Sequence, residues 1–263
     1  MAPKPTILLI PGGMTHNTCY DPLKAELHKA AYEIVVAFLP STDPADPLDQ
    51  SLTAANDARS IYEKSLKPLL EAGKDVVIYA YSYGGTVFGN DGPSFVKSER
   101  QARGEKGGVL GIIYMSIATV PAGMGQLEFM GGTWPPFIAV DEPKKGLLTF
   151  DPIIPSLFND AGPADAERLA KTIVGHSART FDTGVLPPLW AERALDGKRV
   201  WLLAKLDGTF PPEAVRTFIA ASGVEWDIAE RDVGHCGFVT QPMVVAKVIV
   251  EAAEKWASSH ETA

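Results

Sequence analysis

Short β-branched or aliphatic runs alternate along this chain with longer segments of helical period. Such alternation predicts βαβ units around a mainly parallel sheet, because helices carry the chain back between parallel strands. Six runs are nearly continuous in apolar residues, as expected for strands that are covered on both faces. They are residues 6–10, 33–38, 75–81, 109–115, 199–206 and 224–231. The predicted fold class is therefore α/β, with a doubly wound, mostly parallel sheet.

The first residues of the intervening segments mark the expected helices. Residues 22–30 begin with proline after Asp21, the predicted N-cap, and residues 52–72 follow Ser51, the predicted cap of a longer helix. Pro68 is expected to bend or shorten that longer helix. Two further helices that begin with proline are expected at 212–221 and 242–258.

Residues 121–188 interrupt the alternation. They hold nine of the 21 prolines and six aromatic residues, namely Phe129, Trp134, Phe137, Phe150, Phe158 and Phe181. Since a structureless loop of this length is improbable in a compact domain, we predict an inserted lid with short helices such as 164–174. The core is then formed by 1–120 and 189–263. The aromatic residues either line an apolar ligand site or pack the lid onto the core.

Ser82 follows the buried-strand run 75–81 and precedes Tyr83-Gly84-Gly85. A serine at such a strand-to-helix turn is exposed at the carboxyl edge of the sheet, with the following N–H groups directed at developing negative charge. The small residues Ala80 and Gly84, two positions to either side, allow strand and helix to approach. The pattern indicates a nucleophile; the alternative is a serine that serves only the turn.

Two more polar residues come at the ends of later strands. Asp207 directly follows the predicted strand 199–206, and His235 follows the last predicted strand. Histidine suits proton transfer near neutrality, and a carboxylate can orient its ring, so these residues are the candidate base and acid for Ser82. Asp232 is the alternative acid, and a purely structural role is the alternative for His235.

Gly13 and Tyr83 are the candidate backbone donors for an oxyanion. Pro11-Gly12-Gly13 leaves the first predicted strand, and glycine lets a backbone N–H approach a substrate oxygen closely. The N–H of Tyr83, directly after the nucleophile, is the expected second donor.

In this order, these segments resemble the α/β-hydrolase superfamily, in the lid-bearing branch that includes plant methylesterases and hydroxynitrile lyases. The resemblance spans nearly the whole chain and rests on Pro11-Gly12-Gly13, the turn around Ser82, residues 206–212, and Gly234-His235 followed by Gln241-Pro242. It implies a catalytic triad of Ser82, His235 and Asp207. The superfamily hosts esterases, lipases, lactonases, lyases and proteins that only bind a ligand, so the resemblance alone does not select the reaction.

Two positions depart from the family pattern. Family members commonly have His-Gly where this chain has Pro11-Gly12, which removes a side chain that shapes the oxyanion loop. Similar hydroxynitrile lyases carry a lysine directly after the catalytic histidine, and Cys236 stands there in this chain. The second departure disfavours cyanohydrin cleavage by that route.

Charge and cysteine content disfavour several other classes. With 24 Lys+Arg against 32 Asp+Glu, the net charge of -8 repels nucleic acid and anionic lipid. Two cysteines are too few for a disulfide framework, and we expect a cytoplasmic protein. The run 6–10 is too short for a leader peptide, and no apolar stretch is long enough to span a membrane. Motifs for metal or nucleotide binding are absent from the sequence, so no cofactor is expected.

The remaining histidines have expected places of their own. His16 either lines the mouth of the ligand pocket or caps the turn that follows it. His176 is expected at the surface of the lid or packing within it, and His28 and His260 are expected to face solvent. Cys236 is expected to be a small apolar residue without a reactive role.

The expected function is hydrolysis of a carboxylic ester or lactone of a small, largely apolar substrate through an acyl-enzyme on Ser82. Two alternatives stay open: a non-hydrolytic lyase, decarboxylase or cyclase, and a receptor-like module that binds a ligand without turnover. A homodimer is also left open.

Overall fold

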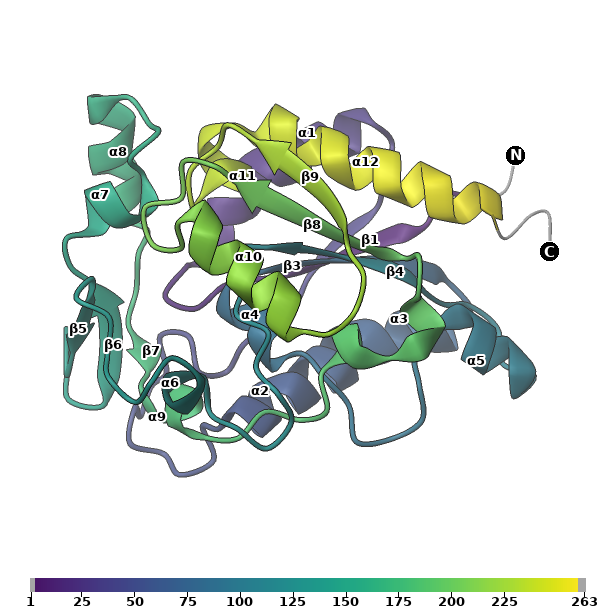
Figure 1. Cartoon of the computed structure of the whole chain (residues 1–263), viewed down its shortest axis with the longest axis horizontal. Coiled ribbons are helices and arrows are strands. Elements are labelled where there is room, and N and C mark those ends of the chain that lie inside the picture. The colour runs from purple at the N-terminus through teal and green to yellow at the C-terminus, as the bar shows by residue number, and fades with distance from the viewer. Residues whose placement is uncertain (1–2, 260–263) are drawn as a thin grey trace.

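A computed structural model describes residues 3–259, and its centre is a six-stranded parallel sheet. The strands lie in the order β2-β1-β3-β4-β8-β9 (Figure 1). Their bounds are β1 Thr6–Ile10, β2 Ile34–Val36, β3 Asp75–Tyr81, β4 Gly108–Met115, β8 Arg199–Ala204 and β9 Asp227–Arg231. The prediction of a doubly wound α/β sheet is confirmed.

Helices cover both faces of this sheet. α1 (Asp21–Lys29) and α12 (Pro242–Ser259) lie on one face, and α2 (Ala54–Ile61), α3 (Lys67–Glu71) and α4 (Tyr83–Val87) lie on the other (Figure 1). α10 (Pro212–Ala221) packs beside β8. The shorter helices of the core are α5 (Lys97–Ala102) and α11 (Gly237–Thr240), with 3-10 turns at Asn17–Tyr20, Leu189–Ala191 and Arg193–Leu195.

Two predicted helix caps are wrong by one or two positions. Asp21 is the first residue of α1, and Tyr20 occupies the cap position. The hydroxyl of Thr53, rather than that of Ser51, accepts the N–H of Asn56 at the start of α2. The predicted helix 52–72 is divided by a π-helical turn, Tyr62–Leu66, before Pro68. A proline has no N–H to bond the preceding turn, so the local hydrogen-bond pattern changes there.

The last predicted strand is also more exposed than expected. The sequence predicts that 224–231 is covered on both faces, but β9 lies at the edge of the sheet, and three of its five residues are exposed and the other two half-buried. Ile228, for example, is 43% exposed. An edge strand has a neighbour on one side only, so an apolar run does not guarantee burial there.

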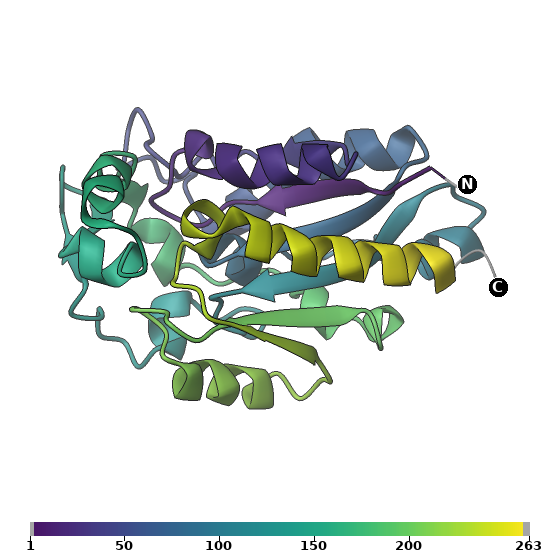
Figure 2. The same cartoon turned by 90° about the horizontal axis from the view of Figure 1, so that it is seen from above.

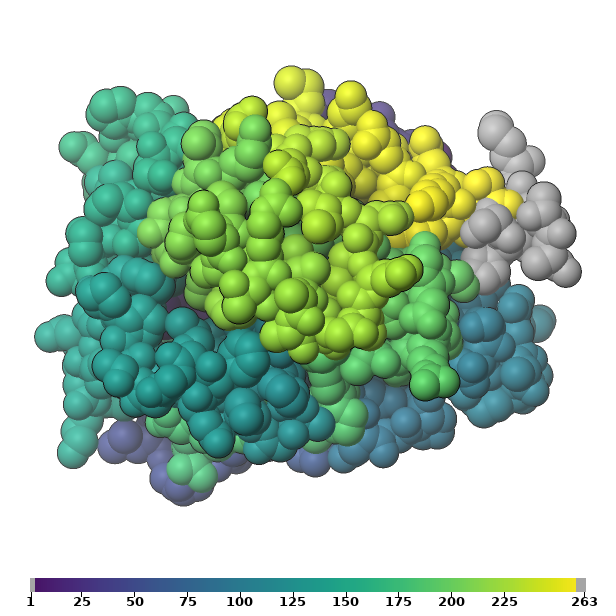
Figure 3. All heavy atoms as spheres, in the orientation of Figure 1, coloured from purple at the N-terminus to yellow at the C-terminus, as the bar shows by residue number. Residues whose placement is uncertain are grey.

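Residues 121–188 form a separate layer against the carboxyl ends of the strands (Figures 1 and 2). Three strands make a small antiparallel sheet, β5 (Ile138–Val140), β6 (Leu147–Phe150) and β7 (His176–Ser177). The helices here are α6 (Gln126–Phe129), α7 (Ile153–Leu157), α8 (Pro163–Ala170) and α9 (Arg179–Asp182). α8 replaces the predicted helix 164–174 and ends earlier. In the space-filling view this layer closes one end of the molecule (Figure 3); its role as a lid stays a prediction.

The central strands are buried along their whole length. Every residue of β1 and β4 is buried, as is every residue of β3 after Asp75. The carboxyl ends of these rigid strands therefore supply fixed positions for the polar residues that follow them.

Within residues 3–259, no helix combines the length and apolar character needed to cross a membrane.

Candidate active site

Ser82 lies at the turn between β3 and α4, in a backbone conformation that serine rarely adopts. Its φ is 48° and its ψ is -131°. The turn needs a glycine at position 84, because any side chain there would clash with the backbone. A Cβ atom would lie 2.1 Å from the carbonyl oxygen of Pro11. The strained turn is held by the packing of α4 against the end of β1 and directs Ser82 away from the core.

His235 and Asp207 are brought together at the neighbouring strand ends. His235 Nδ1 lies 2.9 Å from each carboxylate oxygen of Asp207. Both residues are buried, with 1% and 7% of their surfaces exposed. Since Nδ1 faces a carboxylate, the other ring nitrogen, Nε2, is left for a substrate or nucleophile.

Asp207 is fixed by further donors around its carboxylate. Oδ1 accepts hydrogen bonds from the N–H and hydroxyl groups of Thr209 and from the N–H of Phe210. Oδ2 accepts one from the hydroxyl of Ser116, at 2.7 Å. Burial alone would raise the pKa of Asp207, but attraction to His235 and these hydrogen bonds outweigh it, and the pKa is lowered. The carboxylate is thus held in its charged form.

The alternative acid, Asp232, lies apart from this pair. Its side chain is 76% exposed and forms an ion pair with Lys205 at 2.7 Å.

The sequence did not predict the roles of Ser116 and Thr209 beside Asp207. Thr209 had a local signal, since an aspartate often accepts the N–H two residues later in a turn. Ser116 had only its position directly after β4.

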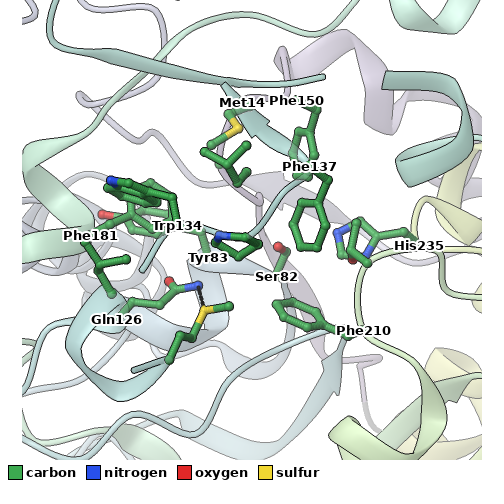
Figure 4. Close-up of a pocket in the computed structure, with 16 residues that line it drawn as sticks. Met14, Ser82, Tyr83, Gln126, Trp134, Phe137, Phe150, Phe181, Phe210 and His235 are labelled. Atoms are coloured by element: carbon green, nitrogen blue, oxygen red, sulfur yellow. Dashed lines mark hydrogen bonds between the residues drawn. The ribbon is translucent and has the colours of Figure 1, made fainter. Parts of the chain in front are cut away.

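Ser82 and His235 line the same cavity (Figure 4). The described residues contain no direct hydrogen bond between the Ser82 hydroxyl and the His235 ring. Catalytic hydrogen bonds are often long or poorly aligned without substrate, so the shared cavity is the relevant observation.

The two candidate oxyanion donors also border this cavity. Gly13 and Tyr83 both line it, Gly13 on the turn after β1 and Tyr83 as the first residue of α4. Across residues 3–259, neither backbone N–H donates to a protein acceptor, whereas Gly12 and Met14 on either side of Gly13 do. Two unpaired N–H groups beside Ser82 form an arrangement suited to a negatively charged oxygen.

The wall of the cavity is mostly apolar and aromatic. It is formed by Met14, Leu127, Met130, Trp134, Pro135, Phe137, Ile138, Phe150, Phe181 and Phe210 (Figure 4). The empty volume between the lining residues, including the open space at the mouth of the cavity, is about 530 Å³. Four of the six aromatic residues of 121–188 therefore line the cavity. Phe129 packs instead on Phe218 of α10, and Phe158 is buried, so both expectations for these aromatics hold in part.

Gln126 is a polar residue in this wall, as are Ser82, Thr209 and His235. The side chain is 7% exposed, and its Oε1 is buried without a hydrogen-bond partner among the described residues. Its Nε2 donates only to the sulfur of Met130, at 3.9 Å. One amide end thus lacks the partner that buried polar atoms normally have.

The other histidines and Cys236 take varied positions. His16 is exposed and caps the turn at Asn17–Tyr20, accepting the N–H of Thr18, so the capping alternative is correct. His28 is exposed, as expected, and His260 lies outside the described residues. Cys236 is buried, and burial raises the pKa of its thiol well above the usual value, as befits a residue without a nucleophilic role.

His176 takes the packing alternative, since it contacts Phe181 of the same segment, but it also packs on the core. It is fully buried, and its ring contacts the ring of Tyr83 with centroids 4.6 Å apart. Burial lowers the pKa of this histidine to about 3.

Among residues 3–259 there is no group of three or more His, Cys, Asp or Glu side chains that could hold a metal ion.

Two known proteins that are named as hydrolases are similar to nearly the whole chain. The chain is 28% identical over 265 residues to probable hydrolase R7 of Phoma sp., covering 95% of this chain and 98% of the relative. It is 27% identical over 256 residues to alpha/beta hydrolase nvfD of Aspergillus novofumigatus, covering 95% and 97%.

Solved structures share the fold at lower identity. A pyrethroid hydrolase of Sphingobium faniae JZ-2 matches with a TM-score of 0.69 and 18% identity, covering 95% of this chain and 97% of the other. Methylesterase MES16 of Arabidopsis matches with a TM-score of 0.65 and 16% identity, covering 95% and 99%. A family model described as the alpha/beta hydrolase family matches residues 7–248, and the chain belongs to this family.

Proposed function

We propose that this protein is a serine hydrolase that cleaves a carboxylic ester or lactone of a small, largely apolar substrate. The observation that carries the proposal is one cavity bordered by Ser82, by His235 with Asp207 behind it, and by two unpaired backbone N–H groups. The names of the relatives and neighbours, which include hydrolases and a methylesterase, support the same reaction class.

The chemistry follows from the position of each group. Ser82 Oγ attacks the substrate carbonyl while His235 Nε2 takes the serine proton, and Asp207 stabilises the resulting imidazolium. The Gly13 and Tyr83 N–H groups bind the carbonyl oxygen as it becomes negative. His235 then gives the proton to the leaving alcohol, which leaves an acyl group on Ser82. Water, deprotonated by His235, releases the acid and restores the serine.

The cavity wall supports an apolar substrate with one polar substituent. Aromatic side chains on residues 121–188, the proposed lid, would bury the acyl or alcohol group. The unpaired oxygen of Gln126 favours a substrate that presents a hydrogen-bond donor, such as a hydroxyl group, to this part of the wall.

Ser82→Ala tests the assignment. We expect the variant to lose at least about 1000-fold in turnover of aryl and short-chain esters, because the nucleophile is absent. A fluorophosphonate probe should modify the wild-type protein at Ser82. Ser98→Ala, at an exposed serine of α5, is the matched control and should keep full activity and labelling. Unchanged turnover in Ser82→Ala would exclude the acyl-enzyme.

Labelled water separates hydrolysis from the alternatives. In H₂¹⁸O, hydrolysis places one heavy oxygen in the carboxylate product, whereas a lyase, decarboxylase or cyclase reaction does not. Stoichiometric binding of a ligand without any product would indicate a receptor-like module instead.

A further inference from the structure

The turn that carries the Gly13 N–H is held on both sides by buried side chains. The N–H of Gly12 donates to the hydroxyl of Tyr20, at 2.8 Å, and the N–H of Met14 donates to His176 Nδ1, at 3.4 Å. Met14 has a φ of 62°, a conformation that non-glycine residues rarely adopt. The Gly13 N–H is thus left unpaired within a turn whose neighbouring N–H groups are both anchored.

From His176 a chain of hydrogen bonds leads to the second oxyanion donor. Ser41 Oγ lies 3.0 Å from His176 Nε2 and donates to Asp57 Oδ2, at 2.5 Å. The same carboxylate oxygen accepts the phenolic hydroxyl of Tyr83, also at 2.5 Å. His176, Ser41 and Asp57 are each completely buried. These side chains come from β7, from the loop after β2 and from α2, so the network joins segments far apart in the sequence.

The donors and acceptors of the network fit one arrangement of protons. Because Met14 N–H donates to Nδ1 of His176, that nitrogen is unprotonated and Nε2 carries the hydrogen, which it can donate to Ser41. Asp57 then accepts from Ser41 and Tyr83 as a carboxylate. Burial keeps His176 neutral, because it lowers the pKa of the ring to about 3. In this arrangement each polar side chain of the network, namely His176, Ser41, Asp57 and Tyr83, has a hydrogen-bond partner.

We propose that His176 and Asp57 are positioning residues for the oxyanion hole. His176 anchors the turn that bears the Gly13 N–H, and Asp57 anchors the side chain of the residue that bears the other N–H, Tyr83. A single buried network therefore fixes both donors relative to Ser82. This inference rests on the proposed function, since it concerns the oxygen that becomes negative after Ser82 attacks. Fixed donors act without reorganisation during the reaction, and small displacements weaken them.

Three variants test the network by its effect on the transition state. Tyr83→Phe removes only the phenolic hydroxyl, Asp57→Asn removes the charge, and His176→Phe keeps a ring of similar shape. In each we expect kcat and the rate of inactivation by a fluorophosphonate probe to fall roughly 10- to 100-fold, with KM changed less than about 3-fold. The backbone donors remain, so the loss should be smaller than that of Ser82→Ala.

Ser60→Ala is the matched control on the same helix as Asp57. Ser60 is also buried, and its hydroxyl donates to the carbonyl oxygen of Phe38 instead of the network. This variant should lose stability without a selective loss of kcat. If the network were merely structural, the three variants would behave as Ser60→Ala does, with kcat and the inactivation rate unchanged in the folded fraction.

The outcomes distinguish this inference from the proposed function. If the probe does not label the wild-type protein, both fail. If it labels the wild type and reacts equally fast with folded Tyr83→Phe, Asp57→Asn and His176→Phe, only the inference is overturned. Tyr83→Phe is the mildest change, so its kcat decides the matter should the other two variants not fold. A wild-type value of kcat in folded Tyr83→Phe would then overturn the inference.

Discussion

Asp207 is fixed by hydrogen bonds from Ser116, Thr209 and Phe210 as well as by its contact with His235. Asp207→Asn keeps the shape of the side chain but removes the charge that selects the His235 tautomer. We expect kcat for ester hydrolysis to fall by about 10⁴, the loss that such a change produces in a comparable triad. Steady-state kinetics would measure this loss.

Asp232→Asn is the control for that prediction. Asp232 lies three residues before His235, but its carboxylate is exposed and paired with Lys205, so this variant should keep wild-type kcat. A large loss in Asp232→Asn, together with normal kcat in Asp207→Asn, would reverse the assignment of the acid.

Gln126→Leu should stabilise the protein while reducing its selectivity. The change replaces a buried amide oxygen that has no partner in the described structure by an apolar group of similar size. We expect the free energy of unfolding to rise by about 1 kcal/mol in urea denaturation. We also expect the ratio of kcat/KM for a hydroxylated ester over its deoxy analogue to fall about 10-fold or more. Gln241→Leu should instead destabilise, because Gln241 donates to Asp160 and to the carbonyl oxygen of Asp232.

Residues of the candidate site differ in how well the sequence predicts them. Ser82, Asp207 and His235 could be predicted because each follows a legible strand, and strand ends meet at one edge of a parallel sheet. Asp57 and His176 could not, because neither has a local pattern that marks it. They meet only through the packing of α2 and β7 around the turn after β1.

At the scale of elements, apolar runs predicted the strands well and their environment less well. β1 and β3 match their predicted bounds, because a continuous apolar run must be buried on both faces. β9 lies within its predicted range of 224–231 but begins three residues later. It also lies at an exposed edge, since strand order is a property of the whole sheet. Helix caps shifted because several polar residues compete for each cap, as Ser51 and Thr53 do before α2.

For the whole molecule, the buried pair of His176 and Asp57 makes a prediction about stability and pH. Burial lowers the pKa of His176 to about 3. Below pH 6.5, this histidine therefore binds a proton in the unfolded chain but stays neutral in the folded chain. This residue costs stability as the pH falls. Burial raises the pKa of Asp57 to about 6, so the folded chain holds a proton between about pH 4 and 6 that the unfolded chain has released. This residue costs stability as the pH rises, and in the wild type the two effects oppose each other.

The two single variants should therefore change the slope of the free energy of unfolding against pH in opposite directions. Between pH 6 and 4, removing His176 in His176→Phe should improve stability relative to wild type by roughly 3 kcal/mol. Over the same interval, Asp57→Asn should lose roughly 2 kcal/mol relative to wild type. Urea denaturation at closely spaced pH values would measure both slopes.

The double variant Asp57→Asn/His176→Phe separates this account from a general acid effect. Because the two opposing contributions are removed together, its difference in stability from wild type should change by less than about 1 kcal/mol between pH 6 and 4, although its absolute stability is lower. The other carboxylates of the chain titrate alike in all four proteins and cancel in these differences. Slopes of the same sign in the two single variants would contradict the account, since burial must shift a histidine and a carboxyl in opposite directions.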